Sequence, residues 1–217
     1  MKKEIIASAI ILFVIASVSF VIAVGSSSGG TPNCQIGSPG CPDTNGVQVN
    51  EVYRMCESKI TVAERIKCRF NNKEILNQGR DYLHEAVEEA CRGHARAEEC
   101  KQLYRQSKEC YEIDSAREKK RCFLEKSGVN INAGGTFRAA PDDSKRNYVV
   151  LLLYELQERI ENMETVGTIT SDEATDLVTQ IVEIKKLIIE GKPRSEIIPK
   201  IQEFKQAYRT IVGGTAQ

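Results

Sequence analysis

Apolar residues recur every three or four positions through most of the chain beyond residue 46, which is the spacing that one face of an α-helix produces. The pattern is densest in residues 143–213, which divide into three such stretches. Short connections force neighbouring helices to run in opposite directions, so this segment predicts an antiparallel three-helix bundle. The side chains expected in its core are Val149, Leu152, Leu153, Leu156, Ile160, Met163, Leu177, Ile181, Ile184, Ile188, Ile198, Ile201, Phe204, Tyr208 and Ile211.

Residues that start and stop helices separate these three stretches. The first helix is expected over about 144–165. Thr170 and Glu173 have the spacing of a capping box, in which a hydroxyl and a carboxylate satisfy free amides of a helix's first turn, so a second helix begins there. The other boundaries are expected at Gly191 and Pro193, which end the second helix, at Ser195, which caps the third, and at Gly213, which ends it.

Residues 47–126 also show helical spacing, but their core residues are fewer. They contain eight Leu and Ile residues and six of the eight cysteines, whereas 143–213 contains sixteen Leu and Ile residues and no cysteine. Because small domains with thin cores often need covalent cross-links, we expect disulfides to hold 47–126 together. Two inward-facing stripes are predicted, one of Val49, Val52, Tyr53, Cys56 and Ile60 and one of Cys100, Leu103, Ser107 and Cys110.

One template occurs twice in this segment. Cys56 and Cys68 are separated by twelve positions, as are Cys110 and Cys122, and each pair encloses a Ser/Thr-x-x-Glu capping box at the same place. A helix that begins between the two cysteines makes a hairpin, and the two thiols then face each other. In a straight helix, residues twelve apart would be about 18 Å apart, far beyond the ~6 Å that a disulfide allows between Cα atoms.

The caps therefore favour local pairing of the cysteines. The bonds expected are Cys34–Cys41, Cys56–Cys68, Cys91–Cys100 and Cys110–Cys122. A crosswise alternative, Cys56 with Cys122 and Cys68 with Cys110, would require each twin segment to be one continuous helix. It is similar to twin C-x9-C hairpins in outline only, because the spacing differs.

The N-terminus contains the longest apolar run of the chain. Residues 5–24 are twenty positions without a charge, and twenty helical residues span about 30 Å, the thickness of a bilayer's hydrocarbon core. Residues 1–25 are therefore expected to be a single-pass signal anchor or, because small residues follow the run, a cleaved signal peptide. Lys2 and Lys3 precede the run, which places the N-terminus inside and the rest of the chain outside, at the cell membrane or secreted.

Two segments rich in Gly, Ser, Pro and Asn are expected to connect the structured parts. Residues 26–46 predict a flexible stalk, and residues 127–142 predict a linker between 47–126 and 143–213. Within the stalk, Pro39 and Gly40 suit a tight turn that would bring Cys34 and Cys41 together, although these thiols could instead link two chains. The expected fold class is all-α: a membrane helix, disulfide-stapled helical hairpins and the three-helix bundle.

Charge and motifs narrow the function classes. Residues 47–126 carry 17 basic and 15 acidic residues, and 142–212 carry 10 and 13, so neither part suits nucleic acid. Cys91, His94 and Cys100 have donor types that zinc prefers, but export favours a Cys91–Cys100 bond, and His84 is expected on a helix surface. The acidic pairs Glu88–Glu89 and Glu98–Glu99 look like solvated helix faces.

Neither a catalytic motif nor a cofactor motif is present in the sequence, so no enzyme, metal site or cofactor is predicted. Two hypotheses remain. The first is a non-catalytic envelope protein, membrane-anchored through residues 5–24 or secreted, that has a structural role or binds another protein or a copy of itself. The second is an extracellular metal- or redox-active domain that uses Cys91, His94 and nearby cysteines.

Overall fold

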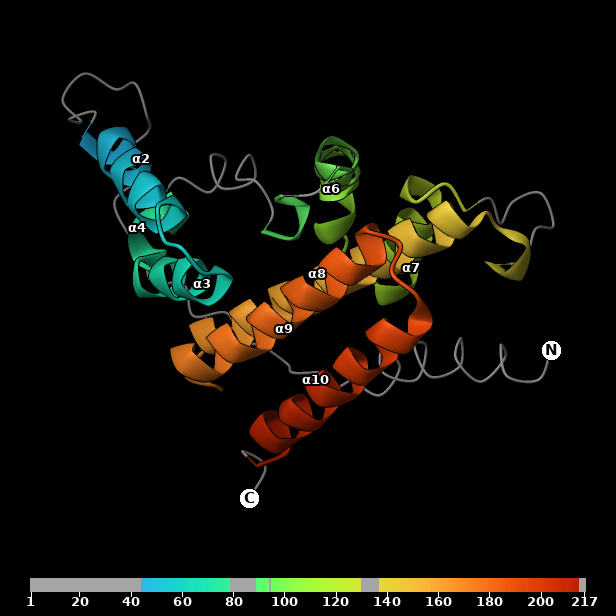
Figure 1. Cartoon of the computed structure of the whole chain (residues 1–217). Helices are drawn as coiled ribbons and strands as arrows, with labels where there is room; N and C mark the ends of the chain where they lie inside the picture. The colour runs from blue at the N-terminus through green and yellow to red at the C-terminus, as the bar shows by residue number, and fades with distance from the viewer. Residues whose placement is uncertain (1–43, 79–88, 94, 130–136, 215–217) are drawn as a thin grey trace. The chain divides into compact units, whose positions relative to one another are not determined.

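The computed structural model describes residues 44–78, 89–93, 95–129 and 137–214 (Figure 1). The chain divides into two compact units, Met1–Thr44 and Asn45–Gln217, and the helices described below belong to the second. Among the described residues there are helices and no strands, so the predicted all-α class is confirmed.

The described residues form eight α-helices and two 3-10 helices. Their bounds are α2 Thr44–Glu57, α3 Val62–Asn71, α4 Lys73–Gln78, the 3-10 helix η1 Glu89–Cys91, α6 Ala97–Tyr111, α7 Ala116–Lys126, the 3-10 helix η2 Phe137–Ala139, α8 Asp142–Thr165, α9 Ser171–Ile189 and α10 Arg194–Gly214.

Helix α9 lies at the centre of the unit. It packs against α8 on one side and α10 on another, and α3 and η1 cover more of its surface. The predicted stripe from Leu177 to Ile188 is buried, and so is a second stripe that includes Val178, Val182 and Lys185. Because several elements cover α9, little of its surface faces solvent, and more of its residues are buried than the single predicted stripe.

Helix α8 is buried on a broader face than its sequence pattern predicts. Leu152, Leu156 and Ile160 are buried as expected, whereas Val149, Leu153 and Met163 are only half-buried. The buried apolar and aromatic positions that the prediction missed are Tyr148, Val150, Leu151 and Tyr154. The cause is that α6 and α7 pack on α8 in addition to α9, so two faces of the helix are covered instead of one.

The helix boundaries of the last segment largely follow their local chemistry. Thr170 and Glu173 form the complete capping box that starts α9. Gly191 has a φ of 70°, a left-handed conformation that glycine adopts without strain, and it ends the helix. Ser195 does not cap α10, because the carbonyl of Pro193 already accepts from the amides of Glu196 at 3.0 Å and Ile197 at 3.4 Å. The helix therefore begins at Arg194.

The helices of the cysteine-rich segment pack on those of the C-terminal segment. Helix α3 and η1 contact α9, while α6 and α7 contact α8, and α8, α9 and α10 run in alternating directions (Figure 1). The domain boundaries 47–126, 127–142 and 143–213 stay predictions, and residues 130–136 of the linker lie outside the described range.

The predictions for the N-terminal part fall largely outside the described residues. These are the membrane segment 5–24, most of the stalk 26–46, and the bond between Cys34 and Cys41. Within the described ranges, no helix has the length and apolar character needed to cross a bilayer.

Candidate functional site

Three disulfides close helical hairpins along the first half of the described chain. Cys56–Cys68 joins α2 to α3 and Cys91–Cys100 joins η1 to α6, each with Cα atoms 5.4 Å apart, and Cys110–Cys122 joins α6 to α7 with Cα atoms 5.6 Å apart. All three are expected local pairs, two of them predicted from capping boxes, and they differ from the crosswise alternative. Every cysteine in the described ranges is bonded.

The two predicted caps start new helices, but they are not equally complete. Thr61 accepts from the Glu64 amide at 3.1 Å, and the Glu64 carboxylate accepts from the Thr61 amide at 3.0 Å. The Thr61 hydroxyl also donates to this carboxylate at 2.9 Å, and the bonds from the Thr61 amide and hydroxyl lower the pKa of Glu64. Ser115 makes only the first of the two contacts, accepting from the Glu118 amide at 3.4 Å, yet α7 still begins at the next residue.

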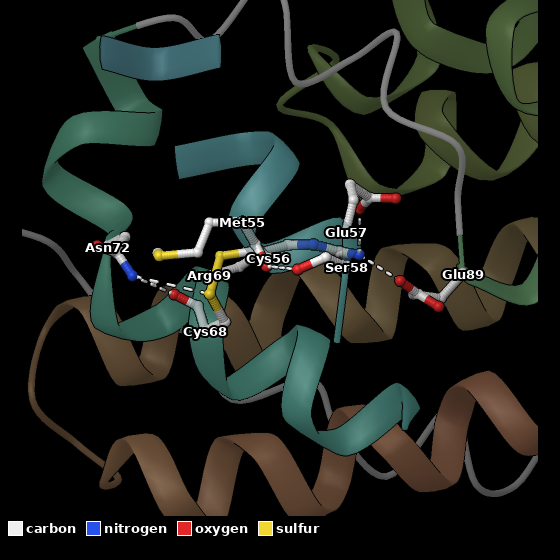
Figure 2. Close-up of a disulfide and its surroundings, with 8 residues drawn as sticks. All are labelled: Met55, Cys56, Glu57, Ser58, Cys68, Arg69, Asn72 and Glu89. Atoms are coloured by element: carbon white, nitrogen blue, oxygen red, sulfur yellow. Dashed lines mark hydrogen bonds and ion pairs between the residues drawn. A yellow bond between two sulfur atoms is a disulfide. The ribbon is translucent and has the colours of Figure 1, made fainter. Parts of the chain in front are cut away.

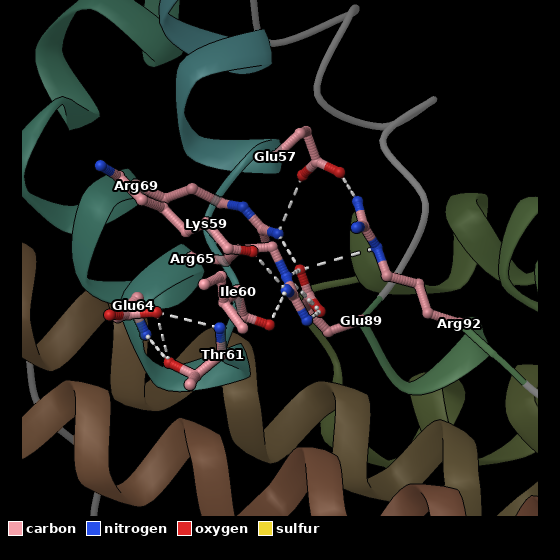
Figure 3. A network of polar contacts seen from close by, with 9 residues as sticks. All are labelled: Glu57, Lys59, Ile60, Thr61, Glu64, Arg65, Arg69, Glu89 and Arg92. Carbon is pink, nitrogen blue, oxygen red and sulfur yellow. Dashed lines mark hydrogen bonds and ion pairs between the residues drawn. The ribbon is translucent and has the colours of Figure 1, made fainter.

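Behind the first hairpin lies a buried ionic cluster that we call the Glu89 cluster: Glu57, Arg65, Arg69, Glu89 and Arg92 (Figure 3). The Glu89 side chain is 2 % exposed. Arg65 donates to both of its oxygens, from Nε at 2.9 and 3.0 Å and from Nη2 at 2.9 Å, and Arg69 donates to Oε1. A carboxylate so deeply buried requires such partners, because an unpaired buried charge is strongly destabilising.

The cluster continues outward through Glu57, which follows Cys56. Arg69 Nη2 is 3.1 Å from one oxygen of Glu57, and Arg92 contacts the other. Figure 2 shows Glu57 and Arg69 beside the Cys56–Cys68 bond, with Asn72 donating to the Cys68 carbonyl at 2.8 Å. Three guanidiniums thus face two carboxylates, and helices from two different disulfide-bonded hairpins supply them.

Arg65 also fixes the turn between α2 and α3. Its Nη1 donates to the carbonyl oxygens of Lys59 at 2.7 Å and Ile60 at 2.9 Å. One guanidinium therefore binds the buried Glu89 and two backbone carbonyls at the end of the hairpin. Such a cluster can hold segments in place, and its carboxylate oxygens are engaged by protein donors.

A second polar group lies in the core between the cysteine-rich helices and the last three. Lys185 on α9 is fully buried, its Nζ donates to Gln157 at 2.6 Å, and it lies 3.7 Å from the ring centroid of Tyr154. The Tyr154 hydroxyl is 3.6 Å from the sulfur of Cys91, and its ring packs against Tyr104 at 4.8 Å. Cation–π and hydrogen-bond contacts of this kind offset part of the cost of burying an ammonium group.

The sequence predicts part of this arrangement. The three disulfides of the described residues are as expected, and so is the solvated pair Glu98 and Glu99, whose side chains are 79 and 66 % exposed. The interpretation of Glu89 as solvated is wrong, because Arg65 and Arg69 draw it into the interior. His84 and His94 lie outside the described residues, and the proposed zinc donors Cys91 and Cys100 are bonded to each other.

One sequence feature could have indicated Lys185. It lies on the apolar stripe of Val178, Val182 and Ile189, at helical spacing, where a lysine is unusual. No comparable feature marks Glu89, since Arg65 and Arg69, the residues that donate hydrogen bonds to it, lie 24 and 20 positions away. Comparison with protein-family models, with curated proteins and with solved structures finds no match for this chain.

Proposed function

We propose that this chain is a non-catalytic helical protein of the cell envelope, membrane-anchored or secreted, that acts by binding another protein. The compartment is supported by the disulfides of the described residues, because such bonds persist in oxidising environments and are rare in the cytosol. The bond between Cys91 and Cys100 also weighs against the metal-site hypothesis, since a bonded sulfur is not a thiolate ligand.

The binding role rests on one observation, the turn between α2 and α3. Ile60 on this turn is 91 % exposed, and Met55, at the end of α2, is 45 % exposed. The sequence pattern predicts Ile60 on the inward stripe of α2, but α2 ends at Glu57, so the side chain leaves the helix face. Single exposed apolar residues are common on protein surfaces, and what distinguishes this one is the rigidity of its backbone.

Several contacts hold the turn in one conformation. Arg65 binds the carbonyls of Lys59 and Ile60, and the Ser58 hydroxyl donates to the Met55 carbonyl at 2.8 Å. The Cys56–Cys68 bond closes the hairpin behind it. A segment that is already ordered loses less conformational entropy on binding, so more of the contact energy is retained. Burying an isoleucine contributes about 1.5–3 kcal/mol, which makes Ile60 a suitable centre for a contact.

Site-specific photo-crosslinking tests this proposal. A photoreactive residue replaces Ile60 in one version of the full chain and Val166, which is 54 % exposed on the α8–α9 connection, in a matched control. We expect a discrete adduct in intact cells from position 60 and not from position 166. Equal adducts from both positions, or none from position 60, would contradict the binding role.

Location and redox state are tested separately. Because eight cysteines are present, we expect the oxidised chain to contain four disulfides. Its mass should then be lower than that of the reduced chain by two hydrogens for each bond. Protease added outside intact cells should remove a C-terminal tag from an anchored chain, whereas a secreted chain should be found in the medium. A tag that is retained by cells and protected until they are lysed would exclude an external location.

A further inference from the structure

The charged residues of the Glu89 cluster directly adjoin two of the disulfides. Glu57 follows Cys56, and Arg69 follows Cys68. On the other hairpin, Arg92 follows Cys91. Because neighbouring residues move together, the closed Cys56–Cys68 bond helps to determine where Glu57 and Arg69 lie, and the closed Cys91–Cys100 bond does the same for Arg92.

Glu89 connects the two hairpins. It lies two positions before Cys91, in η1, and it accepts from Arg65 and Arg69, which stand on α3 on either side of Cys68. Opening of the Cys91–Cys100 bond removes the covalent link between η1 and α6, so that Glu89 is held less firmly against Arg65. Opening of Cys56–Cys68 loosens α3 against α2 and weakens the same contacts from the other side.

The two bonds also differ in access. Cys91 is fully buried and Cys100 is 5 % exposed, whereas in the other bond Cys56 is fully buried but Cys68 is half-buried, so this bond can be approached from its Cys68 end. The Tyr154 hydroxyl, 3.6 Å from the Cys91 sulfur, helps to cover the inner bond. A reductant therefore reaches Cys56–Cys68 before Cys91–Cys100.

We propose that Cys56–Cys68 and Cys91–Cys100 are a coupled, ordered redox pair: opening the outer bond releases the inner one, and Glu89 transmits the effect. Opening the inner bond must favour opening of the outer one by the same factor, because a coupling free energy between two sites acts equally in both directions. The Cys110–Cys122 bond shares helix α6 with Cys100, but it lies outside this coupling, because Tyr111 and Phe123 follow its cysteines where the other two bonds have residues of the Glu89 cluster. This inference does not depend on the binding partner proposed above.

The chemistry is ordinary thiol–disulfide exchange with a small thiol such as glutathione. One glutathione thiolate attacks a sulfur of the protein disulfide and displaces the other cysteine as a thiolate, which takes up a proton. A second glutathione thiolate attacks the mixed disulfide and releases the second cysteine. Each opened bond thus consumes two glutathione thiols and yields two cysteine thiols and one oxidised glutathione.

Partial reduction of the full chain tests the order. The chain is incubated in graded glutathione buffers, quenched with acid, alkylated, and analysed by mass spectrometry for each of the three bonds. We expect molecules with Cys91–Cys100 open and Cys56–Cys68 closed to be much rarer than molecules with only Cys56–Cys68 open, while Cys110–Cys122 opens independently of both. A substantial population of such molecules in the unaltered chain would overturn the proposal.

Paired variants test the coupling itself. In Cys56→Ala/Cys68→Ala, the equilibrium constant for reducing Cys91–Cys100 should rise about tenfold, within the usual range for coupled sites. The matched control Cys110→Ala/Cys122→Ala should leave it unchanged. Equal effects of the two double variants would show general destabilisation and refute a specific link.

Glu89→Gln tests the residue that transmits the effect. Glu89→Gln is introduced both into the unaltered chain and into Cys56→Ala/Cys68→Ala, and it should abolish the tenfold difference between them in the reduction of Cys91–Cys100. Glu155→Gln, which removes the partner of Lys119 on α7, should preserve that difference. If Glu89→Gln does not fold, Arg92→Gln serves in its place, since Arg92 is 26 % exposed and its loss is milder. A tenfold difference that survives in the variant that folds would exclude the cluster as the link.

Discussion

The hairpins α2–α3 and α6–α7 share one sequence template and differ in what fills it. Both disulfides close a separation of twelve residues, with Cα atoms 5.4 and 5.6 Å apart. The residues that follow the cysteines are Glu57 and Arg69 in the first hairpin, an ion pair at 3.1 Å. In the second they are Tyr111 and Phe123, whose ring centroids are 5.0 Å apart.

A second matched position extends the comparison. Arg65 and Lys119 both lie three residues before the second cysteine of their hairpin, and each reaches a glutamate outside it. Arg65 binds Glu89 in η1, and Lys119 lies 3.2 Å from Glu155 on α8. Cysteine spacing and caps therefore determine the hairpin, while the intervening positions determine which element it is attached to. The first attachment is a buried ion pair and the second is a more exposed one, while the Tyr111–Phe123 ring contact lies inside its hairpin.

The largest effect on stability is expected for the α6–α7 hairpin, in which Tyr111 packs against Phe123. Phe123 is 1 % exposed, so Phe123→Ala should leave a cavity and lower the free energy of unfolding by about 3–5 kcal/mol. Leu124→Ala, at a half-buried neighbour, should cost less. Urea unfolding of the oxidised full chain measures both. Similar losses for the two variants would show that the Tyr111–Phe123 contact is not what secures this hairpin.

Glu89→Gln is the corresponding substitution for the α2–α3 hairpin, whose Arg65 and Arg69 bind Glu89. It keeps the side chain's size but leaves Arg65 and Arg69 without their buried carboxylate, so we expect a loss of about 3 kcal/mol. Glu155→Gln should cost less, because the Glu155 side chain is 15 % exposed and its partner Arg159 is 45 % exposed. The same urea measurement compares the two variants, and equal losses of unfolding free energy would show that the two ion pairs stabilise the chain equally.

The caps should differ by a smaller amount. Thr61→Ala removes the hydroxyl of a complete capping box and should destabilise the chain by about 1 kcal/mol. Ser115→Ala should have a smaller effect, since Ser115 accepts a single bond at 3.4 Å. Thermal unfolding followed by circular dichroism measures the difference, and a larger effect at Ser115 would contradict the geometry.

The smallest effect concerns pH. Hydrogen bonds from the Thr61 amide and hydroxyl lower the pKa of Glu64 below its ordinary value of 4.5, so the folded state favours the ionised form. This contribution to stability is present above pH 4.5 and is lost as pH falls through the lower pKa of the folded chain. NMR titration of the Glu64 carboxyl should show the lowered pKa, and Thr61→Ala should return it toward 4.5.

Local features of the sequence predicted more of this molecule than its long-range contacts. Thr61, Ser115 and Thr170 each begin a helix at the expected place, and the first two caps account for the Cys56–Cys68 and Cys110–Cys122 bonds that enclose them. The Cys91–Cys100 bond follows from Gly93, a helix stop between its two cysteines. These inferences succeed because their partners are a few positions away. The helical spacing of apolar residues gives a wrong prediction at Ile60, because this spacing continues past Glu57, where α2 ends.

Burial that depends on distant partners was not predictable in this way. Glu89 is drawn inward by residues 20 and 24 positions earlier, so its neighbour Glu88 gives no indication of its burial. Helix α8 shows the same effect on apolar residues: Tyr148 and Tyr154 are buried because helices from the cysteine-rich segment pack on it. The pattern of one helix does not specify how many others will cover it.

The buried Lys185 has a consequence for the alignment of α8 and α9. Contacts between Leu, Ile and Val side chains can be satisfied at more than one axial offset, whereas Lys185 needs Gln157 and the ring of Tyr154. Sliding one helix by a single turn moves these groups about 5.4 Å, beyond the reach of the ammonium group. We therefore expect Lys185→Met to retain its helices but to show doubled NMR amide signals along α9. A single set would mean that the apolar contacts alone define the register of this pair.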